Sequence, residues 1–174
     1  SDMAGRRLLL VDANSLANRA FYALPPLSTS KGVPTNAVYG FLTMLFRLID
    51  ERQPEYIICA FDHPSPTFRH VEFEDYKATR APSPDEFKVQ IPMLKDALSA
   101  LDMAFVELPG FEADDIIGTL ACKYSAEGFD VLILSGDKDC LQLVGEGREA
   151  ILFVRGISQH RQYDREAVKQ DMGV

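Results

Sequence analysis

Seven carboxylic acids in this sequence of 174 residues lie in four short groups, and each group adjoins an apolar segment. Asp12 follows residues 8–11, and Asp62 follows residues 56–61. The complete set is Asp12, Asp62, Glu112, Asp114, Asp115, Asp137 and Asp139. Carboxylates that share a cleft oppose one another's ionisation, so such a set requires either protonation or bound cations. Oxygen ligands without histidine or cysteine suit Mg²⁺ or Mn²⁺, and two such ions about 4 Å apart are a common apparatus for phosphodiester hydrolysis.

Each acid taken singly also has an ordinary structural explanation. Acids at a helix N-terminus stabilise the helix dipole by about 0.3–1 kcal/mol each, which accounts for one or two of the three in residues 112–115. An aspartate after a strand is a common turn residue. These explanations do not require all four groups to meet at one place, whereas a metal site does.

The elements that must position these acids follow from an alternation of apolar runs and helical periodicity. Strands are expected at residues 8–11, 56–61, 103–108 and 131–134, and helices at 36–51, with Thr35 as N-cap, 86–101 and 112–125. This alternation predicts an α/β fold whose central, mostly parallel sheet is flanked by helices on both faces. Because the carboxyl ends of parallel strands share one edge of a sheet, the seven acids are expected to converge there.

The pattern changes after residue 144. Residues 150–155 and 157–163, joined around Gly156, predict a pair of edge strands, and Asp164 is expected to cap a helix over 165–172. We place one domain at 8–163 and the start of a further helical element at 164–174. We interpret residues 1–7 as a lead in which Ser1 and Asp2 are a cloning remnant. A helix that has barely begun leads us to expect a piece of a longer protein.

The composition is that of a soluble globular domain, with 47% hydrophobic and 25% charged residues and no apolar run near the ~20 residues of a membrane span. Three unpaired cysteines, Cys59, Cys122 and Cys140, are interpreted as small core residues of a protein from the reducing cytoplasm. The net charge of −8 argues against a nucleic-acid partner, but without the seven clustered acids the balance is −1.

Residues 68–88 interleave cations with aromatic rings, a composition that suits single-stranded nucleic acid because cations follow phosphates and rings stack on bases. The cations are Arg69, Lys77 and Arg80, and the rings are Phe68, Phe73, Tyr76 and Phe87. Pro82 and Pro84 are expected to divide the segment into two helical pieces. A solvated amphipathic helix with a few buried rings is the alternative. Arg19, close after Asp12, is expected to reach a phosphate near the acids.

Six stretches together resemble the 5′-nuclease (flap endonuclease) family and, within it, the N-terminal 5′→3′ exonuclease domain of bacterial DNA polymerase I. They span most of residues 8–144 and read LLLVDANSLANRAFYALP, KGVPTNAVYGFLTML, AFD, PTFRHVEFEDYKATR, PGFEADDIIGTLA and SGDKDCLQLV. The resemblance implies a PIN-like fold with a helical arch at about 68–92. It also implies Mg²⁺- or Mn²⁺-dependent cleavage of DNA at a 5′ end or flap, in replication and repair, in the bacterial nucleoid. The parent chain is either a polymerase or a free-standing nuclease.

The resemblance also assigns roles to single residues. The first metal site is surrounded by Asp12, Asp62, Glu112, Asp114, Asp115 and Asp137, whereas Asp137 and Asp139 contribute to the second. Lys77 and Arg80 steady the scissile phosphate, Tyr76 stacks on a base, and Arg69 and Arg19 contact the backbone. Two further aspartates of the second site and a helix–hairpin–helix element have no match here, so an incomplete second site and weak activity are expected.

Two other functions are compatible with parts of the pattern. A phosphoacceptor receiver domain also carries acids and Mg²⁺ at the strand ends of a doubly wound sheet, but it needs neither the EADD group at 112–115 nor a basic arch. A catalytically weak DNA-binding fragment is compatible with an incomplete second metal site, although seven retained acids favour catalysis.

Overall fold

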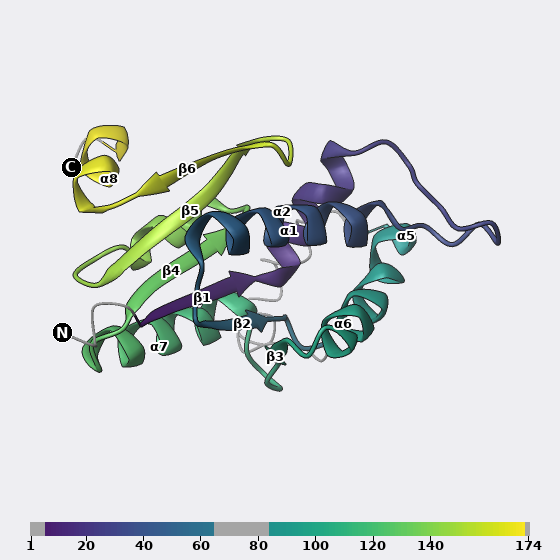
Figure 1. The fold of residues 1–174 in the computed structure, drawn as a ribbon. Coiled ribbons are helices and arrows are strands. Elements are labelled where there is room, and N and C mark those ends of the chain that lie inside the picture. The colour runs from purple at the N-terminus through teal and green to yellow at the C-terminus, as the bar shows by residue number, and fades with distance from the viewer. Residues whose placement is uncertain (1–5, 65–83, 173–174) are drawn as a thin grey trace.

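A mixed sheet forms the centre of the computed structural model, which describes residues 6–64 and 84–172. Within them the sheet has six strands in the order β3-β2-β1-β4-β5-β6 (Figure 1). The strands are β1 (Arg7–Asp12), β2 (Tyr56–Ala60), β3 (Ala104–Val106), β4 (Asp130–Ser135), β5 (Arg148–Arg155) and β6 (Gln159–Tyr163). Neighbouring strands are parallel except β5 and β6, which form the antiparallel edge pair predicted around Gly156.

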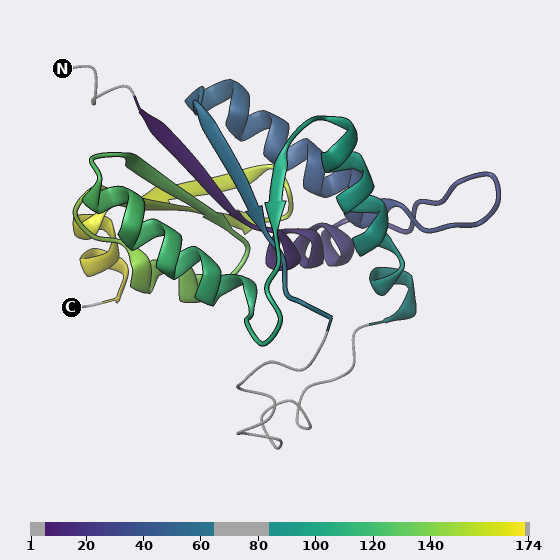
Figure 2. The same ribbon diagram turned by 90° about the horizontal axis from the view of Figure 1, so that it is seen from below.

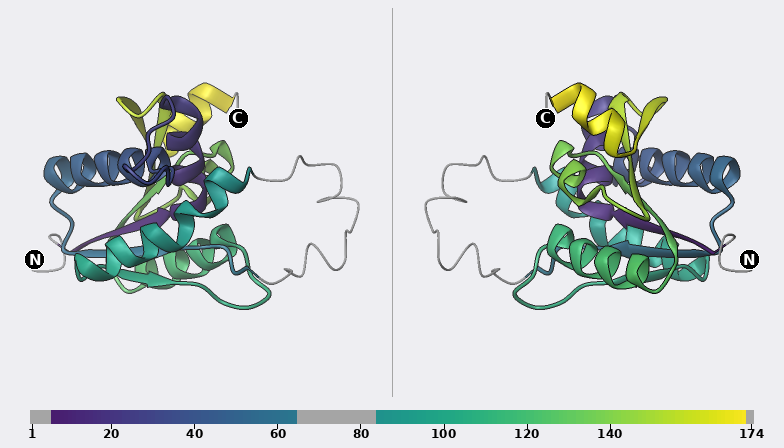
Figure 3. Two further views of the ribbon diagram at one scale, coloured as in Figure 1. Left: turned by 90° about the vertical axis from the view of Figure 1, so that its right-hand side faces the viewer. Right: turned by 90° about the vertical axis from the view of Figure 1, so that its left-hand side faces the viewer.

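Helices cover both faces of the sheet, as predicted. They are α1 (Ala13–Ala23), α2 (Asn36–Arg52), α5 (Asp85–Lys88), α6 (Gln90–Ala100), α7 (Ala113–Ala126), the 3-10 helix η2 (Lys138–Leu143) and α8 (Arg165–Met172). Helices α1, α2 and α6 lie on one face and α7 on the other (Figures 2 and 3). In the described part of the chain, no helix combines the length and the apolar character that a membrane crossing requires.

The central strands are apolar throughout because both of their faces are covered. In β1, Leu9 and Val11 pack with the α1, α2 and α6 layer, whereas Leu8 and Leu10 pack with α7. The same alternation holds in β4 and β5. This two-sided burial fixes the register of β1 between β2 and β4, and so places the end of β1 beside the segment that follows β4.

The helix predicted over 86–101 is in fact two helices, α5 and α6, separated at Val89. Pro92 supplies the reason, because a proline ring clashes with the carbonyl four residues earlier, which here belongs to Lys88 at the end of α5. Pro92 is tolerated in the first turn of α6, where its missing N–H has no helical partner to lose.

Of two further expectations, the N-cap of α2 is confirmed, and the burial of all three cysteines is wrong. Thr35 is the N-cap of α2 but makes no side-chain capping bond; Gln90 of α6 accepts hydrogen bonds from the Ala37 and Val38 N–H groups at 2.7 and 3.1 Å instead. Cys59 and Cys140 are buried, but Cys122 is exposed. It lies on α7 just beyond the inward-facing Ala121, where the helical turn carries it towards solvent.

Candidate functional site

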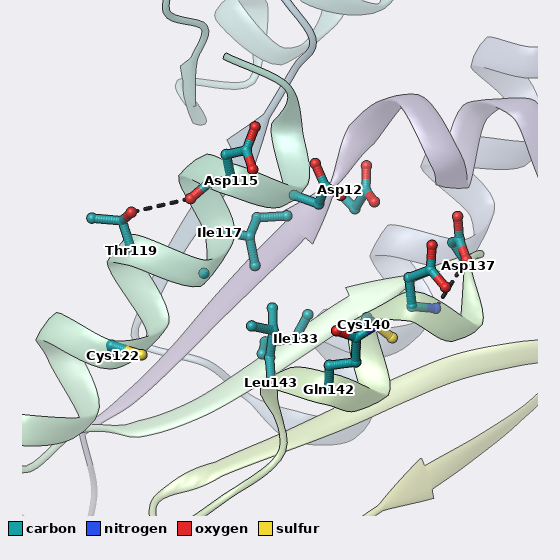
Figure 4. A pocket seen from close by; sticks show the side chains of 13 residues that line it. Asp12, Asp115, Ile117, Thr119, Cys122, Ile133, Asp137, Cys140, Gln142 and Leu143 are labelled. Atoms are coloured by element: carbon teal, nitrogen blue, oxygen red, sulfur yellow. Dashed lines mark hydrogen bonds between the residues drawn. The ribbon is translucent and has the colours of Figure 1, made fainter. Parts of the chain in front are cut away.

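A cavity of about 480 Å³ opens at the carboxyl ends of β1 and β4, beside the N-terminal half of α7. Five of the seven predicted acids line it: Asp12, Asp114, Asp115, Asp137 and Asp139. Figure 4 shows Asp12 at the end of β1, Asp115 on α7 and Asp137 in the segment after β4. Carboxylates from three parts of the sequence thus line one cavity, because the parallel topology brings the strand ends to one edge of the sheet.

Asp12 is both the last residue of β1 and the N-cap of α1. Its Oδ1 accepts a hydrogen bond from the Ser15 N–H at 3.3 Å, and its Oδ2 accepts one from Ser135 Oγ at 3.4 Å. The pKa of Asp12 is raised to about 7, mainly by burial and further by the nearby carboxylates of Asp62 and Asp114, against the lowering effect of the Ser15 bonds. The cavity therefore disfavours an ionised Asp12 until positive charge is supplied.

Asp62 lies two residues beyond β2 and joins that strand end to α7. Its N–H donates to Asn14 Oδ1 at 2.8 Å, and its Oδ1 accepts from the Ala113 N–H at 2.7 Å. It is outside the set of residues that line the cavity, yet its charge acts on Asp12. Asp62 thus belongs to the same group of acids, and it also accepts a hydrogen bond from the first residue of α7.

The acids that open α7 divide into two kinds. Glu112 and Asp115 form a capping box, in which the Glu112 side chain accepts from the Asp115 N–H and Asp115 Oδ2 accepts from the Glu112 N–H at 3.2 Å. Asp114 and Asp115 line the cavity, whereas Glu112 does not. Helix capping therefore accounts for Glu112, but it leaves Asp114 in the cavity for another reason.

Asp137 and Asp139 begin the turn into η2. Asp137 Oδ1 accepts from the Asp139 N–H at 2.9 Å, and the Asp137 N–H donates to Ser135 Oγ at 3.0 Å. Ser135 is fully buried, and its Oγ lies 3.0 Å from Ser15 Oγ. Sequence reasoning missed this serine pair. The available signal was the position of each serine within three residues of an acid, Ser135 at the end of β4 and Ser15 in the first turn of α1.

All charged side chains that line the cavity are carboxylates, and their oxygens suit a hard divalent cation, which favours oxygen ligands. Among residues 6–64 and 84–172, no three acidic, histidine or cysteine side chains are close enough to hold one ion together as they stand. Mg²⁺ retains several of its waters in proteins, so a few direct carboxylates are sufficient. The residues present therefore fit a hydrated ion that only a few carboxylates hold directly.

The predicted DNA-contacting residues are only partly within the described chain. Arg19 of α1 is half-buried, and its Nη1 lies 3.4 Å from the Gly156 carbonyl oxygen in the β5–β6 turn. It lines a second cavity, which shares Asp137 with the first. Arg69, Tyr76, Lys77 and Arg80 lie outside the residues that the structure describes.

Comparisons with known proteins show the family and the fold of this chain. The chain is 52% identical to a 5'-3' exonuclease of Aquifex aeolicus (strain VF5) over 141 residues, which are 81% of this chain and 49% of that protein. It is 44% identical to DNA polymerase I of Bacillus subtilis (strain 168) over 169 residues, 97% of this chain and 19% of that one. The chain thus spans about half the length of the first relative and about a fifth of the second.

Among solved structures, the T5 D15 protein co-crystallised with metal ions superposes with a TM-score of 0.69 at 20% identity, over 97% of this chain and 62% of that one. A D15 flap endonuclease complex with DNA and metal ions gives a TM-score of 0.65 at 19% identity, over 97% of this chain and 61% of that one. These likenesses establish the PIN-like α/β fold. Residues 7–173 match the family described as "5'-3' exonuclease, N-terminal resolvase-like domain". The receiver-domain alternative is thereby excluded, and the chain belongs to this 5'-3' exonuclease family.

Proposed function

We propose that this chain is a Mg²⁺- or Mn²⁺-dependent nuclease domain that hydrolyses phosphodiester bonds of DNA at a 5′ end or 5′ flap. The observation that carries the proposal is the cavity lined by five carboxylates, in which the pKa of Asp12 is raised to about 7. Relatives named as a 5'-3' exonuclease and as DNA polymerase I support the same reaction. With it we propose a role in replication and repair, in the bacterial nucleoid.

The acids divide between two ion sites in this proposal. Asp12, Asp62, Asp114 and Asp115 hold the first ion directly or through water, with Glu112 and Asp137 around them, and Asp137 and Asp139 contribute to the second. Bound divalent ions lower the pKa of a coordinated water and stabilise negative charge on the phosphate. Asp12, Asp62 and Asp114 are the catalytic carboxylates in this proposal. Asp12 and Asp114 line the cavity, and the charges of Asp62 and Asp114 act on Asp12.

The remaining roles concern the DNA strand and follow the family resemblance. Arg19 and Arg69 contact the backbone, Tyr76 stacks on a base, and Lys77 and Arg80 steady the scissile phosphate. Residues 8–163 form the nuclease domain, and residues 164–174 begin a helical DNA-binding element. Most of the arch expected at about 68–92 lies outside the residues that the structure describes. The parent protein is a DNA polymerase I or a free-standing exonuclease.

The test separates binding from cleavage. Labelled 5′-flap DNA is bound by the chain in Ca²⁺, and the Ca²⁺ is then replaced by Mn²⁺ or Mg²⁺. Wild-type protein is expected to bind in Ca²⁺ and to cleave after the exchange. Asp114→Asn is expected to abolish cleavage and to weaken binding far less, whereas the matched control Asp50→Asn, at an exposed position near the end of α2, cleaves normally. Binding without cleavage at saturating protein and metal would identify a non-catalytic DNA-binding fragment instead.

A further inference from the structure

A shallow groove of about 700 Å³ adjoins the acidic cavity, and Asp137 lines both. Asn18, Arg19 and Tyr22 of α1 form one side of the groove, and Lys138 of η2 forms another. The charged lining differs sharply between the two hollows. All charged residues that line the first are acidic, whereas Arg19 and Lys138 outnumber Asp137 in the groove.

The floor of the groove is held in place by close packing of α1 against the segment after β4. A Cβ added at Gly136 would lie 2.8 Å from the Ser15 carbonyl oxygen and 3.3 Å from Arg19 Cβ. The Gly136 N–H also donates to Ser15 Oγ at 3.1 Å. Arg19 extends this contact to the β5–β6 turn through the Gly156 carbonyl oxygen. The groove is therefore pre-formed, and its two cations project from fixed elements.

Tyr22 supplies an exposed aromatic surface on the α1 side. Its side chain is 66% exposed, although the ring rests edge-on against Phe21 with centroids 5.0 Å apart. Phe21 in turn packs edge-on against the buried Phe87 at 5.6 Å. A ring that is braced from behind and open in front, next to two cations, is the combination that binds single-stranded nucleic acid without sequence preference.

We infer that this groove binds the nucleotide next to the bond that is cut, with Lys138 on its phosphate and Tyr22 stacked on its base. The inference rests on the proposed function, which makes a DNA strand the ligand of the acidic cavity. A strand that presents one phosphate to that cavity carries its neighbouring phosphate past Asp137. That neighbour requires positive charge from side chains, and Lys138 stands at this boundary.

The test is a thermodynamic cycle in which protein substitutions are combined with changes to the DNA. Affinity is measured in Ca²⁺, so that the result does not depend on catalysis. Flap DNA carries a single neutral methylphosphonate on either side of the scissile phosphate, and affinity is measured by fluorescence anisotropy. Lys138→Ala is expected to weaken binding about three- to tenfold and to flatten the slope of log affinity against log salt by about 0.7–0.9. If Lys138 contacts one of the two neighbouring phosphates, a methylphosphonate at that phosphate should weaken binding by wild type but not by Lys138→Ala.

Tyr22 is tested in the same way, with an abasic site at the nucleotide next to the scissile bond. Tyr22→Ala is expected to weaken binding about fivefold or more, Tyr22→Phe to bind as wild type, and the abasic site to add no further loss to Tyr22→Ala. Lys123→Ala, at an exposed position in the last turn of α7, is the control, and its effect on affinity should be additive with that of every modified DNA. If the losses from Lys138→Ala and Tyr22→Ala add to those from the modified DNA on both sides of the scissile phosphate, the proposal that this groove binds the neighbouring nucleotide is refuted. Mn²⁺-dependent cleavage by the same variants then shows separately whether the nuclease function holds.

Discussion

The carboxylate of Asp62 accepts a hydrogen bond from the backbone N–H of Ala113 at 2.7 Å, which joins the end of β2 to the first residue of α7. The first N–H groups of a helix have no partner within the helix, so this contact stabilises α7. The same carboxylate raises the pKa of Asp12. Asp62 therefore has a structural contribution and an electrostatic one, and two substitutions separate them.

Asp62→Asn is expected to keep the hydrogen bond, because the amide oxygen is also an acceptor, while it removes the charge. Cleavage of flap DNA should be lost, and the free energy of unfolding in EDTA should stay close to that of wild type. Asp62→Ala should lose cleavage and also about 1–2 kcal/mol of stability, because the Ala113 N–H then lacks this acceptor. Cleavage assays and urea unfolding measure the two effects. Equal destabilisation by Asn and Ala would refute the separation.

The raised pKa of Asp12 predicts how the stability of metal-free protein depends on pH. The pKa is about 7 in the folded chain, against 3.8 for an unperturbed aspartate. The folded state binds the Asp12 proton more tightly than the unfolded state does, and the resulting stability is fully present below the unfolded pKa. This contribution, about 4 kcal/mol at its largest, is lost as pH rises from about 4 through 7. Asp12→Asn lacks this titration, so it should unfold at a higher temperature than wild type at pH 8 in EDTA.

The matched measurement adds Mn²⁺ at pH 8. Wild type should gain thermal stability because the ionised Asp12 then contributes to ion binding, whereas Asp12→Asn should gain much less. The difference in free energy of unfolding between the two proteins, followed from pH 4 to pH 8 in EDTA, isolates Asp12 from the other carboxylates. A difference that does not change with pH would show that Asp12 is ionised normally.

The sequence predicted the sheet and the meeting of the acids for a simple physical reason. Continuous apolar runs such as residues 8–11 and 131–134 indicate strands buried on both faces, and parallel strands bring their carboxyl ends to one edge. What each acid does at that edge depends on neighbours that are distant in sequence. Glu112 is used in a capping box, and Asp62 reaches Ala113 across 51 positions. Local pattern contains no signal for such contacts.

Gly136 provides a test of how closely α1 must approach the end of β4. An added Cβ would lie 2.8 Å from a backbone oxygen of Ser15, which cannot move without shifting α1 and the Asp12 cap. Gly136→Ala is therefore expected to cost about 1–3 kcal/mol and to reduce Mn²⁺-dependent cleavage. Gly118→Ala in α7 is the control, because its Cβ would meet only Leu143 Cδ2 at 3.5 Å.

The control should behave in the opposite way. Alanine is favoured over glycine inside a helix by about 0.5–1 kcal/mol, so Gly118→Ala should raise the thermal midpoint of unfolding. Calorimetry on both variants gives the comparison. Equal effects of the two substitutions would mean that α1 can move away from Gly136 at little cost.

Gln90 carries the last prediction, because this buried side chain holds three helices together. Gln90 is 1% exposed, and its Oε1 accepts from the Ala37 and Val38 N–H groups in the first turn of α2. Its Nε2 donates to Asn36 Oδ1 at 2.9 Å, and Asn36 Nδ2 donates to the Phe21 carbonyl oxygen at 3.0 Å. The network therefore connects α6 and α2 to α1, the helix that carries Arg19 and Tyr22.

Gln90→Leu retains the volume of the side chain but removes its acceptor and its donors. The buried N–H groups of Ala37 and Val38 then lack this partner, so the variant should lose about 2–4 kcal/mol of stability. Gln170→Leu on the exposed face of α8 makes the same chemical change and should alter stability by less than about 0.5 kcal/mol. Urea unfolding compares the two. A loss for Gln90→Leu no larger than that of the control would show that packing alone, and not the hydrogen-bond network, holds α2 against α6.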